Sequence, residues 1–191
     1  MSDTLPVKFF STAAALRKWL VANHAKQEGV WLRIYKKDAG KKSITYAEAL
    51  DEALCFGWID GMKKGLDEVS WVQRFTPRRP KSSWSKINTA HAERLVREGK
   101  MQAAGLRQIE AAKTDGRWNA AYDSPKTAEP PTDFLKALSQ NKKAKAFFLT
   151  LNKANIYAIV YRLQTAKKSE TRQRRMAQIL AQLEEGKKPH P

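Results

Sequence analysis

Glycines, tryptophans and charged side chains are concentrated in two neighbouring stretches of the chain, residues 55–61 and residues 74–88. In the second stretch, a loop with three cations and several serines leads into a helical pattern that begins near Ser85. The first N–H groups of a helix have no partner within it, so cations and hydroxyls beside them can hold a phosphate or a carboxylate. A tryptophan can add a stacking face for an aromatic ligand. These features predict a ligand-binding site made of Trp58, Asp60, Arg74, Arg78, Arg79, Lys81, Ser83, Trp84 and Ser85.

A structural interpretation of the same residues stays open. Serines often cap helices, arginines often remain solvated, and a tryptophan such as Trp84 is often part of the core. Asp60 lies between Gly57 and Gly61, where it could pair with Arg74 on a facing strand and act as a general base beside an apolar ring. An aspartate in a glycine-rich hairpin more often accepts hydrogen bonds from backbone N–H groups or an arginine. We therefore predict no catalytic residue here.

The cysteine and the histidines of the chain give little indication of a catalytic or metal-binding site. Cys55 is the single cysteine, which excludes an internal disulfide and a zinc site of several thiolates. It could be a nucleophile only if the fold brought His24 or His91 close to it, and its structural interpretation is a small buried hydrophobe. These two histidines and His190 show no metal-ligand spacing, and the chain has no phosphate-binding loop, dinucleotide fingerprint or nucleophile elbow. We predict no metal and no cofactor.

The chain is strongly basic. Thirty-six lysines and arginines against nineteen acidic residues give a formal net charge of +17, which draws a protein toward polyanions. In residues 139–191, twelve basic residues oppose three glutamates. A basic face of this kind could contact a phosphate backbone, although a solvated face of an amphipathic helix is the simpler explanation. The candidate nucleic-acid-binding residues are Lys167, Lys168, Arg172 and Arg174.

Start signals and periodicity predict the elements that position these residues. Thr12 before an apolar pattern predicts a helix over about residues 12–24. Thr45 and Glu48 form a capping box, which predicts a second helix that ends at Gly57. Short alternating segments predict three strands of a small sheet. These strands are at residues 30–36, 57–62 and 69–75, with a turn at residues 63–67 between the last two.

From about Ser85 onward the pattern is helical, with a proline-rich interruption. The predicted fold class is therefore α+β, with a small, mostly antiparallel sheet and helices in the N-terminal half, and a helical C-terminal part. The predicted organisation is an α+β domain at 1–123, a proline-rich linker at 124–131, a basic helical region at 132–185 and a disordered tail at 186–191.

The chain offers no signal for a membrane or for export. Its first residues lack a basic segment followed by a long apolar run, and no segment approaches the ~20 apolar residues that span a bilayer. The single cysteine fits a reducing compartment. We expect a cytoplasmic location.

Five short motifs follow one another along the chain: Cys55-Phe-Gly-Trp-Ile-Asp-Gly61, Arg74-Phe-Thr-Pro-Arg78, Ser82-Ser-Trp-Ser-Lys-Ile-Asn88, Gly99-Lys-Met-Gln-Ala-Ala-Gly105 and Glu170-Thr-Arg172. With them, the chain resembles the bacterial YdeI/OmpD-associated family, also described as bacteriocin-protection proteins, over nearly its whole length. The resemblance implies association with a porin and protection against cationic antimicrobial peptides, and it implies no catalytic residues. It also implies a periplasmic location, from which this chain departs because it shows no signal peptide.

These observations predict a non-enzymatic binding or stress-protection protein with an anion-binding surface. The alternative is a nucleic-acid-binding protein that uses its basic surface. An enzyme that acts on an unidentified small substrate is a third interpretation. The sequence does not indicate an oligomeric state.

Overall fold

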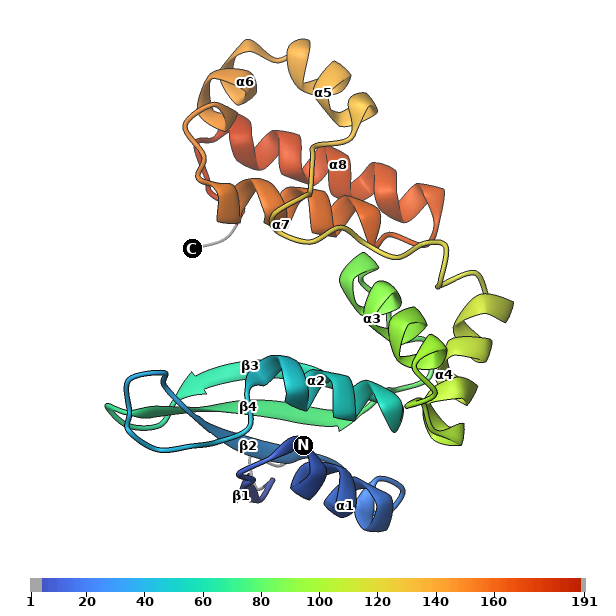
Figure 1. Ribbon diagram of the computed structural model, residues 1–191. Coiled ribbons are helices and arrows are strands. Elements are labelled where there is room, and N and C mark those ends of the chain that lie inside the picture. The colour runs from blue at the N-terminus through green and yellow to red at the C-terminus, as the bar shows by residue number, and fades with distance from the viewer. Residues whose placement is uncertain (1–4, 190–191) are drawn as a thin grey trace. The chain divides into compact units, whose positions relative to one another are not determined.

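The computed structural model describes residues 5–189 of the chain and divides into two compact units (Figure 1). The first unit comprises Met1–Ser82 and Asn88–Asn119, and the second comprises Ser83–Ile87 and Ala120–Pro191. The sheet lies in the first unit, and the second unit is helical. The predicted α+β fold class is confirmed.

The sheet of the first unit has four strands in the order β1-β2-β4-β3. β1 pairs with β2 in parallel, whereas β4 pairs with β2 and with β3 in antiparallel fashion. The strands are β1 (Val7–Phe9), β2 (Val30–Tyr35), β3 (Trp58–Gly65) and β4 (Ser70–Pro77), and the helices that accompany them are α1 (Ala13–Asn23), α2 (Tyr46–Cys55), α3 (Lys86–Arg97) and α4 (Ala103–Thr114).

The first two helices begin at the predicted caps. The Thr12 side chain accepts a hydrogen bond from the Ala15 N–H, and Thr45 and Glu48 form the complete capping box of α2. The capping box satisfies two N–H groups that the helix itself leaves without partners. α2 ends before Gly57, whose φ of 73° lies in the left-handed region that favours glycine. Both predicted helices are confirmed.

The hairpin of β3 and β4 is longer than predicted. Residues 63–65 were expected in the turn, but β3 continues through Gly65, so the turn lies at residues 66–69. The register shifts between Asp60 and Lys63, which indicates a β-bulge at residues 61–62. The bulge changes the face of the sheet to which each following residue of β3 points.

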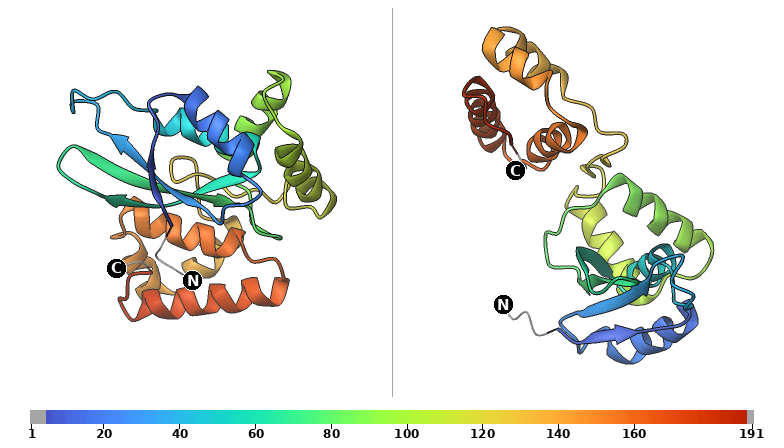
Figure 2. Two further views of the ribbon diagram at one scale, coloured as in Figure 1. Left: turned by 90° about the horizontal axis from the view of Figure 1, so that it is seen from below. Right: turned by 90° about the vertical axis from the view of Figure 1, so that its left-hand side faces the viewer.

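The two faces of the sheet differ in what lies over them. Helices α1 and α2 pack on one of them, the covered face, where Trp58 contacts Trp19 of α1 and Trp71 contacts Tyr46 of α2. Among the described residues of the first unit, no helix lies over the opposite face (Figure 2). Paired residues in neighbouring strands point to the same face, and successive residues alternate between faces. The pairing places on this second face, the open face, Phe9, Trp31, Arg33, Tyr35, Lys64, Val72 and Arg74.

Helix α4 packs closely against the C-terminal end of α2. Gly105 makes this approach possible, because an added Cβ atom there would lie 2.5 Å from the Cys55 carbonyl oxygen and 2.8 Å from the Leu54 carbonyl oxygen. The Gln102 N–H also donates to the Cys55 carbonyl oxygen at 3.1 Å. A glycine in the middle of a helix is usually unfavourable, so its presence in α4 is explained by this contact.

The second unit joins a short early segment to the C-terminal helices. Ser85 forms an isolated parallel bridge with Tyr122, and Lys86 forms an ion pair of 2.7 Å with Asp123. Asp123 also accepts a hydrogen bond from Gln164 at 2.6 Å. The helices are α5 (Thr132–Ser139), α6 (Lys142–Phe148), α7 (Lys153–Gln164) and α8 (Ser169–Glu184). Their buried core consists of Phe134, Leu138, Ala144, Phe148, Leu151, Ile159, Leu163, Ile179 and Leu183.

Two further sequence predictions concern membrane-spanning helices and the C-terminal tail. None of the helices within residues 5–189 has the length and apolar character needed to cross a membrane. The predicted disordered tail begins at Gly186, just after α8, and its last two residues, His190 and Pro191, lie outside the described residues. The disorder of the tail and the predicted domain boundaries stay predictions.

Candidate functional site

Trp58 of the predicted site lies in the core of the first unit. Its side chain is on the covered face, and only 1% of the residue is exposed. The indole N–H donates to the backbone carbonyl of His24 at 3.1 Å, and the ring meets Trp19 edge-on with 5.9 Å between centroids. A buried tryptophan usually needs such a partner for its polar end. In this fold Trp58 supports α1 and its C-terminal end.

Asp60 and Arg74 point to opposite faces of the sheet. Asp60 is paired with Phe75 in the register, and its carboxylate accepts a hydrogen bond from the Tyr46 hydroxyl at 2.8 Å. Arg74 is paired with Trp31 and therefore belongs to the open face. The ion pair expected from the sequence between Asp60 and Arg74 is not formed, because adjacent residues of β4 alternate between faces and the bulge lies opposite Arg74.

The cationic loop after β4 is partly buried. Arg78 is 5% exposed, and its N–H donates to the Gly57 carbonyl oxygen at 3.0 Å. Arg79 and Lys81 are exposed, and the N–H of Arg79 donates to the Ser82 hydroxyl. Lys81 has a φ of 68°, which is unusual for a residue with a side chain. These three cations belong to the first unit.

The rest of the predicted anion site belongs to the second unit. Ser83 is exposed, Ser85 is half-buried and Trp84 is 2% exposed. α3 starts at Lys86, and the first N–H of the helix already donates to the Tyr122 carbonyl oxygen at 2.9 Å. At least one of the helix N–H groups that we predicted to bind an anion therefore has a hydrogen-bond acceptor within the protein. Binding at residues 78–85 stays a prediction.

Arg74 occupies an unusual position on the open face. The side chain is half-buried, and its guanidinium lies against the bulge, since a Cβ atom added at Gly61 would be 3.1 Å from Arg74 Nε. This Nε atom is buried, and within residues 5–189 it has no hydrogen-bond acceptor. A buried N–H without an acceptor is costly, and a guanidinium is a preferred partner of carboxylates and phosphates. Arg74 is therefore the residue of the predicted site whose surroundings favour an anion.

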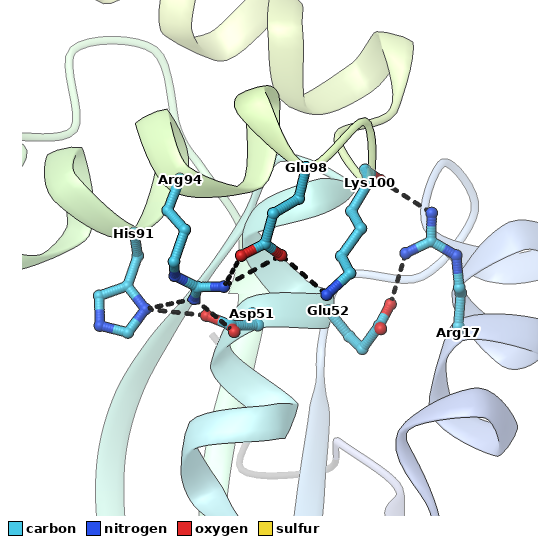
Figure 3. Close-up of polar contacts among 7 residues, drawn as sticks. All are labelled: Arg17, Asp51, Glu52, His91, Arg94, Glu98 and Lys100. Atoms are coloured by element: carbon cyan, nitrogen blue, oxygen red, sulfur yellow. Dashed lines mark hydrogen bonds and ion pairs between the residues drawn. The ribbon is translucent and has the colours of Figure 1, made fainter.

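An ionic cluster between α1, α2 and α3 was not predicted (Figure 3). Asp51 of α2 lies 2.8 Å from His91 Nδ1 and 2.5 Å from Arg94 Nη2. Glu98 pairs with Arg94 at 3.1 Å and with Lys100 at 2.7 Å. The hydrogen bond that Arg94 donates to Asp51 raises the pKa of Arg94, and the one that Lys100 donates to Glu98 lowers the pKa of Glu98. The cluster continues through Arg17, which pairs with Glu52 and donates to the Lys100 carbonyl oxygen.

The ionic cluster holds helices together, and we expect Asp51→Asn to destabilise the first unit by about 1 kcal/mol. The substitution weakens the ion pair with Arg94 and the hydrogen bond with His91, both partly shielded from water, and such contacts contribute up to about 1 kcal/mol each when they form a network. Urea unfolding followed by tryptophan fluorescence measures the change, which should shrink at high salt. Asp38→Asn is the matched control, because Asp38 is exposed and forms no ion pair among residues 5–189. Equal stability of the two variants would contradict a structural role for the cluster.

Cys55 is buried at the end of α2, where only 1% of the residue is exposed. This burial raises the pKa of the thiol to about 11, so the thiolate, which is the nucleophile, is nearly absent at neutral pH. We expect the folded protein not to react with an aromatic disulfide reagent at about pH 8, and the protein unfolded in guanidinium chloride to react at its single thiol. Rapid reaction of the folded protein would show that the thiol is accessible.

The candidate nucleic-acid-binding residues of the second unit lie at the start of α8. Lys167, Lys168 and Arg174 are exposed. Arg172 instead forms an ion pair with Asp133 of α5, which raises the pKa of Arg172 and lowers that of Asp133. An arginine held by a carboxylate offers less charge to a phosphate backbone. Nucleic-acid binding by these residues stays a prediction.

A hollow of about 490 Å³ lies beside α7 in the second unit. Its aromatic side consists of Tyr157 and Tyr161, whose ring centroids are 6.0 Å apart. Burial raises the pKa of Tyr157. Lys153 is the charged residue of its lining. The remaining lining residues are Pro125, Ala154 and Ala158.

Two family models match different parts of the chain. Residues 8–108 match a domain of unknown function, DUF8412, and residues 127–186 match the family described as bacteriocin-protection, YdeI or OmpD-associated. No curated protein and no solved structure matches the chain significantly. The resemblance predicted from the sequence is confirmed for residues 127–186, which contain the motif at residues 170–172. The four motifs between residues 55 and 105 lie within the other match.

The first match covers more than half of the chain, from β1 into α4. The second covers α5 to α8. Neither description names a ligand or a catalytic residue. The chain therefore belongs to the family of the domain of unknown function DUF8412, and its residues 127–186 are similar to the family described as bacteriocin-protection, YdeI or OmpD-associated.

Proposed function

We propose that the protein is a non-enzymatic binding protein and that its anion-binding surface is on the open face of the sheet, around Arg74. The observation that carries the proposal is the half-buried guanidinium whose Nε has no acceptor within residues 5–189. An oxygen of a bound phosphate or carboxylate would accept this hydrogen bond and would neutralise a charge that the fold keeps partly out of water.

A second cation lies close to Arg74 on the same face. Lys64 places its ammonium group 5.0 Å from the centre of the Trp31 ring, and Trp31 is the residue paired with Arg74. A cation held over an aromatic face is positioned without an acidic partner, and Lys64 has no ion pair among the described residues. Arg33 contributes less charge, because Asp67 pairs with it at 2.7 Å. Arg74 and Lys64 together supply two charges for one anion.

A role in protection would follow from the binding of an anionic partner. The family matched by residues 127–186 is described by bacteriocin protection. A protein with a net charge of +17 repels cationic peptides at long range, so direct capture of such peptides is electrostatically unfavourable. We therefore assign the protective role to an interaction with an anionic molecule. Arg74 is the centre of that interaction.

Titration with tripolyphosphate, followed by tryptophan fluorescence, tests the proposal. We expect Arg74→Ala to weaken binding about ten-fold or more, since a charge-assisted hydrogen bond is lost. Arg97→Ala is the matched control, because it removes the same charge from an exposed site on α3. Equal weakening in both variants would show that only net charge matters and would contradict the proposed surface.

A further inference from the structure

Aromatic rings and cations alternate on the open face. Phe9 of β1 is paired with Arg33 of β2, and its ring meets Tyr35 edge-on with 5.7 Å between centroids. Arg33 lies over the Tyr35 ring at 4.7 Å, and Lys64 lies over Trp31. The face therefore carries π surfaces and positive charges within a few residues of each other on neighbouring strands.

Phe9 is the ring of this face that is most available to a ligand. The residue is 47% exposed, whereas Trp31 is only 7% exposed. Phe9 lies on β1, which among the described residues pairs with β2 alone and is therefore an edge strand of the sheet. No cation is placed over the Phe9 ring among the described residues. An exposed phenylalanine beside several cations can accept a stacked ring from a ligand.

We infer that the ligand of the open face is a single-stranded nucleic acid, an inference that rests on the anion-binding surface proposed around Arg74. Its phosphates would be held by Arg74 and Lys64, and a base would stack on Phe9. Charge complementarity favours a polyanion, because the chain has a net charge of +17 and Lys64 and Arg74 have no carboxylate partner within residues 5–189. The exposed ring of Phe9 favours a polyanion that also carries aromatic groups.

A single strand fits this combination better than other polyanions. Its bases are unstacked and can contact an aromatic side chain, whereas a duplex keeps the faces of its bases inside the stack. Inorganic polyphosphate and the headgroups of anionic lipids have charge but no aromatic ring to stack. Stacking on a sheet face combined with phosphate contacts is a recurrent way to bind single strands.

Fluorescence anisotropy with a labelled oligo-dT of about 16 nucleotides tests the inference. We expect the single strand to bind at least about ten-fold more tightly than a duplex of the same length at equal salt. Phe9→Leu, which keeps an apolar side chain but removes the ring, should weaken binding of the single strand about five-fold or more. Phe9→Tyr, which keeps an aromatic ring, should bind the single strand as tightly as the wild type does. Circular dichroism verifies that both variants are folded.

Two further probes separate this inference from the proposed function. The binding of tripolyphosphate should depend on Arg74 and not on Phe9. Vesicles that contain phosphatidylserine should bind more weakly than the single strand. If the binding of tripolyphosphate depends on Arg74 while Phe9→Leu does not change the binding of the oligonucleotide, the inference is overturned and the anion-binding surface stands. Equal binding of duplex, or stronger and Phe9-dependent binding of vesicles, also overturns it. If no probe depends on Arg74, both proposals fail.

Discussion

Gly105→Ala should destabilise the first unit by about 2–3 kcal/mol, although the same change in most helices is stabilising. The added methyl group would lie 2.5 Å from the Cys55 carbonyl oxygen and 2.8 Å from that of Leu54. These backbone atoms belong to the end of α2 and cannot move without displacing it. The Met101 sulfur, 2.3 Å from the added atom, is the end of a flexible side chain and can move. Helix α4 must therefore shift away from α2.

The shift would also weaken the hydrogen bond from Gln102 N–H to the Cys55 carbonyl oxygen. Urea unfolding followed by tryptophan fluorescence reports on the first unit, because five of the six tryptophans belong to it. The expected loss is a large part of the stability of a typical domain, which is about 5–15 kcal/mol. A lower urea midpoint with an unchanged slope would show that the substitution acts on stability.

Gly65→Ala is the matched control. Gly65 is at the end of β3, and no atom lies within 4 Å of the position that its Cβ would take. A methyl group there meets open space, so we expect a change within about 0.5 kcal/mol. An increase in stability of Gly105→Ala by about 1 kcal/mol, as helix propensity alone predicts, would contradict the close packing of α4 on α2.

Local signals in the sequence predicted the starts of α1 and α2 correctly. Thr12, Thr45 and Glu48 act through hydrogen bonds within three residues, so their effect is visible without knowledge of the fold. The alternation of β2 was predictable for the same reason. The end of β3 was not, because Lys63 and Lys64 resemble turn residues. In the fold they lie over Trp71 and Trp31 at 4.2 Å and 5.0 Å, and these contacts extend the strand.

The candidate site was only partly predictable. Arg74 was identified, but the sequence could not show that it lies on the face opposite Asp60, because this depends on the register and on the bulge. The ionic cluster joins Asp51 to His91, forty residues away, and no local rule connects them. A weaker signal existed in the spacing of His91, Arg94 and Glu98, which places three polar side chains on one side of α3.

Trp58→Phe should destabilise the first unit by about 2 kcal/mol, and Trp58→Ala by about 4 kcal/mol. Phenylalanine leaves a small cavity and removes the N–H that donates to the His24 carbonyl oxygen, so this partly buried acceptor loses its partner. Alanine also removes the ring that packs edge-on against Trp19. The difference between the variants measures the packing, and the cost of Trp58→Phe measures the hydrogen bond together with the smaller cavity. Urea unfolding determines both values.

The same variants decide whether Trp58 belongs to the core or to a ligand-binding surface. Trp58 is on the covered face, whereas the proposed surface around Arg74 is on the open face. Folded Trp58→Phe should therefore bind tripolyphosphate with an affinity within about two-fold of the wild type, despite its lower stability. Thr76→Val is the reference variant for this binding measurement. It changes a half-buried residue of β4 on the open face, whereas Trp58→Phe changes a residue on the covered face. Weaker binding by folded Trp58→Phe would instead support the interpretation from sequence, in which Trp58 contacts the ligand.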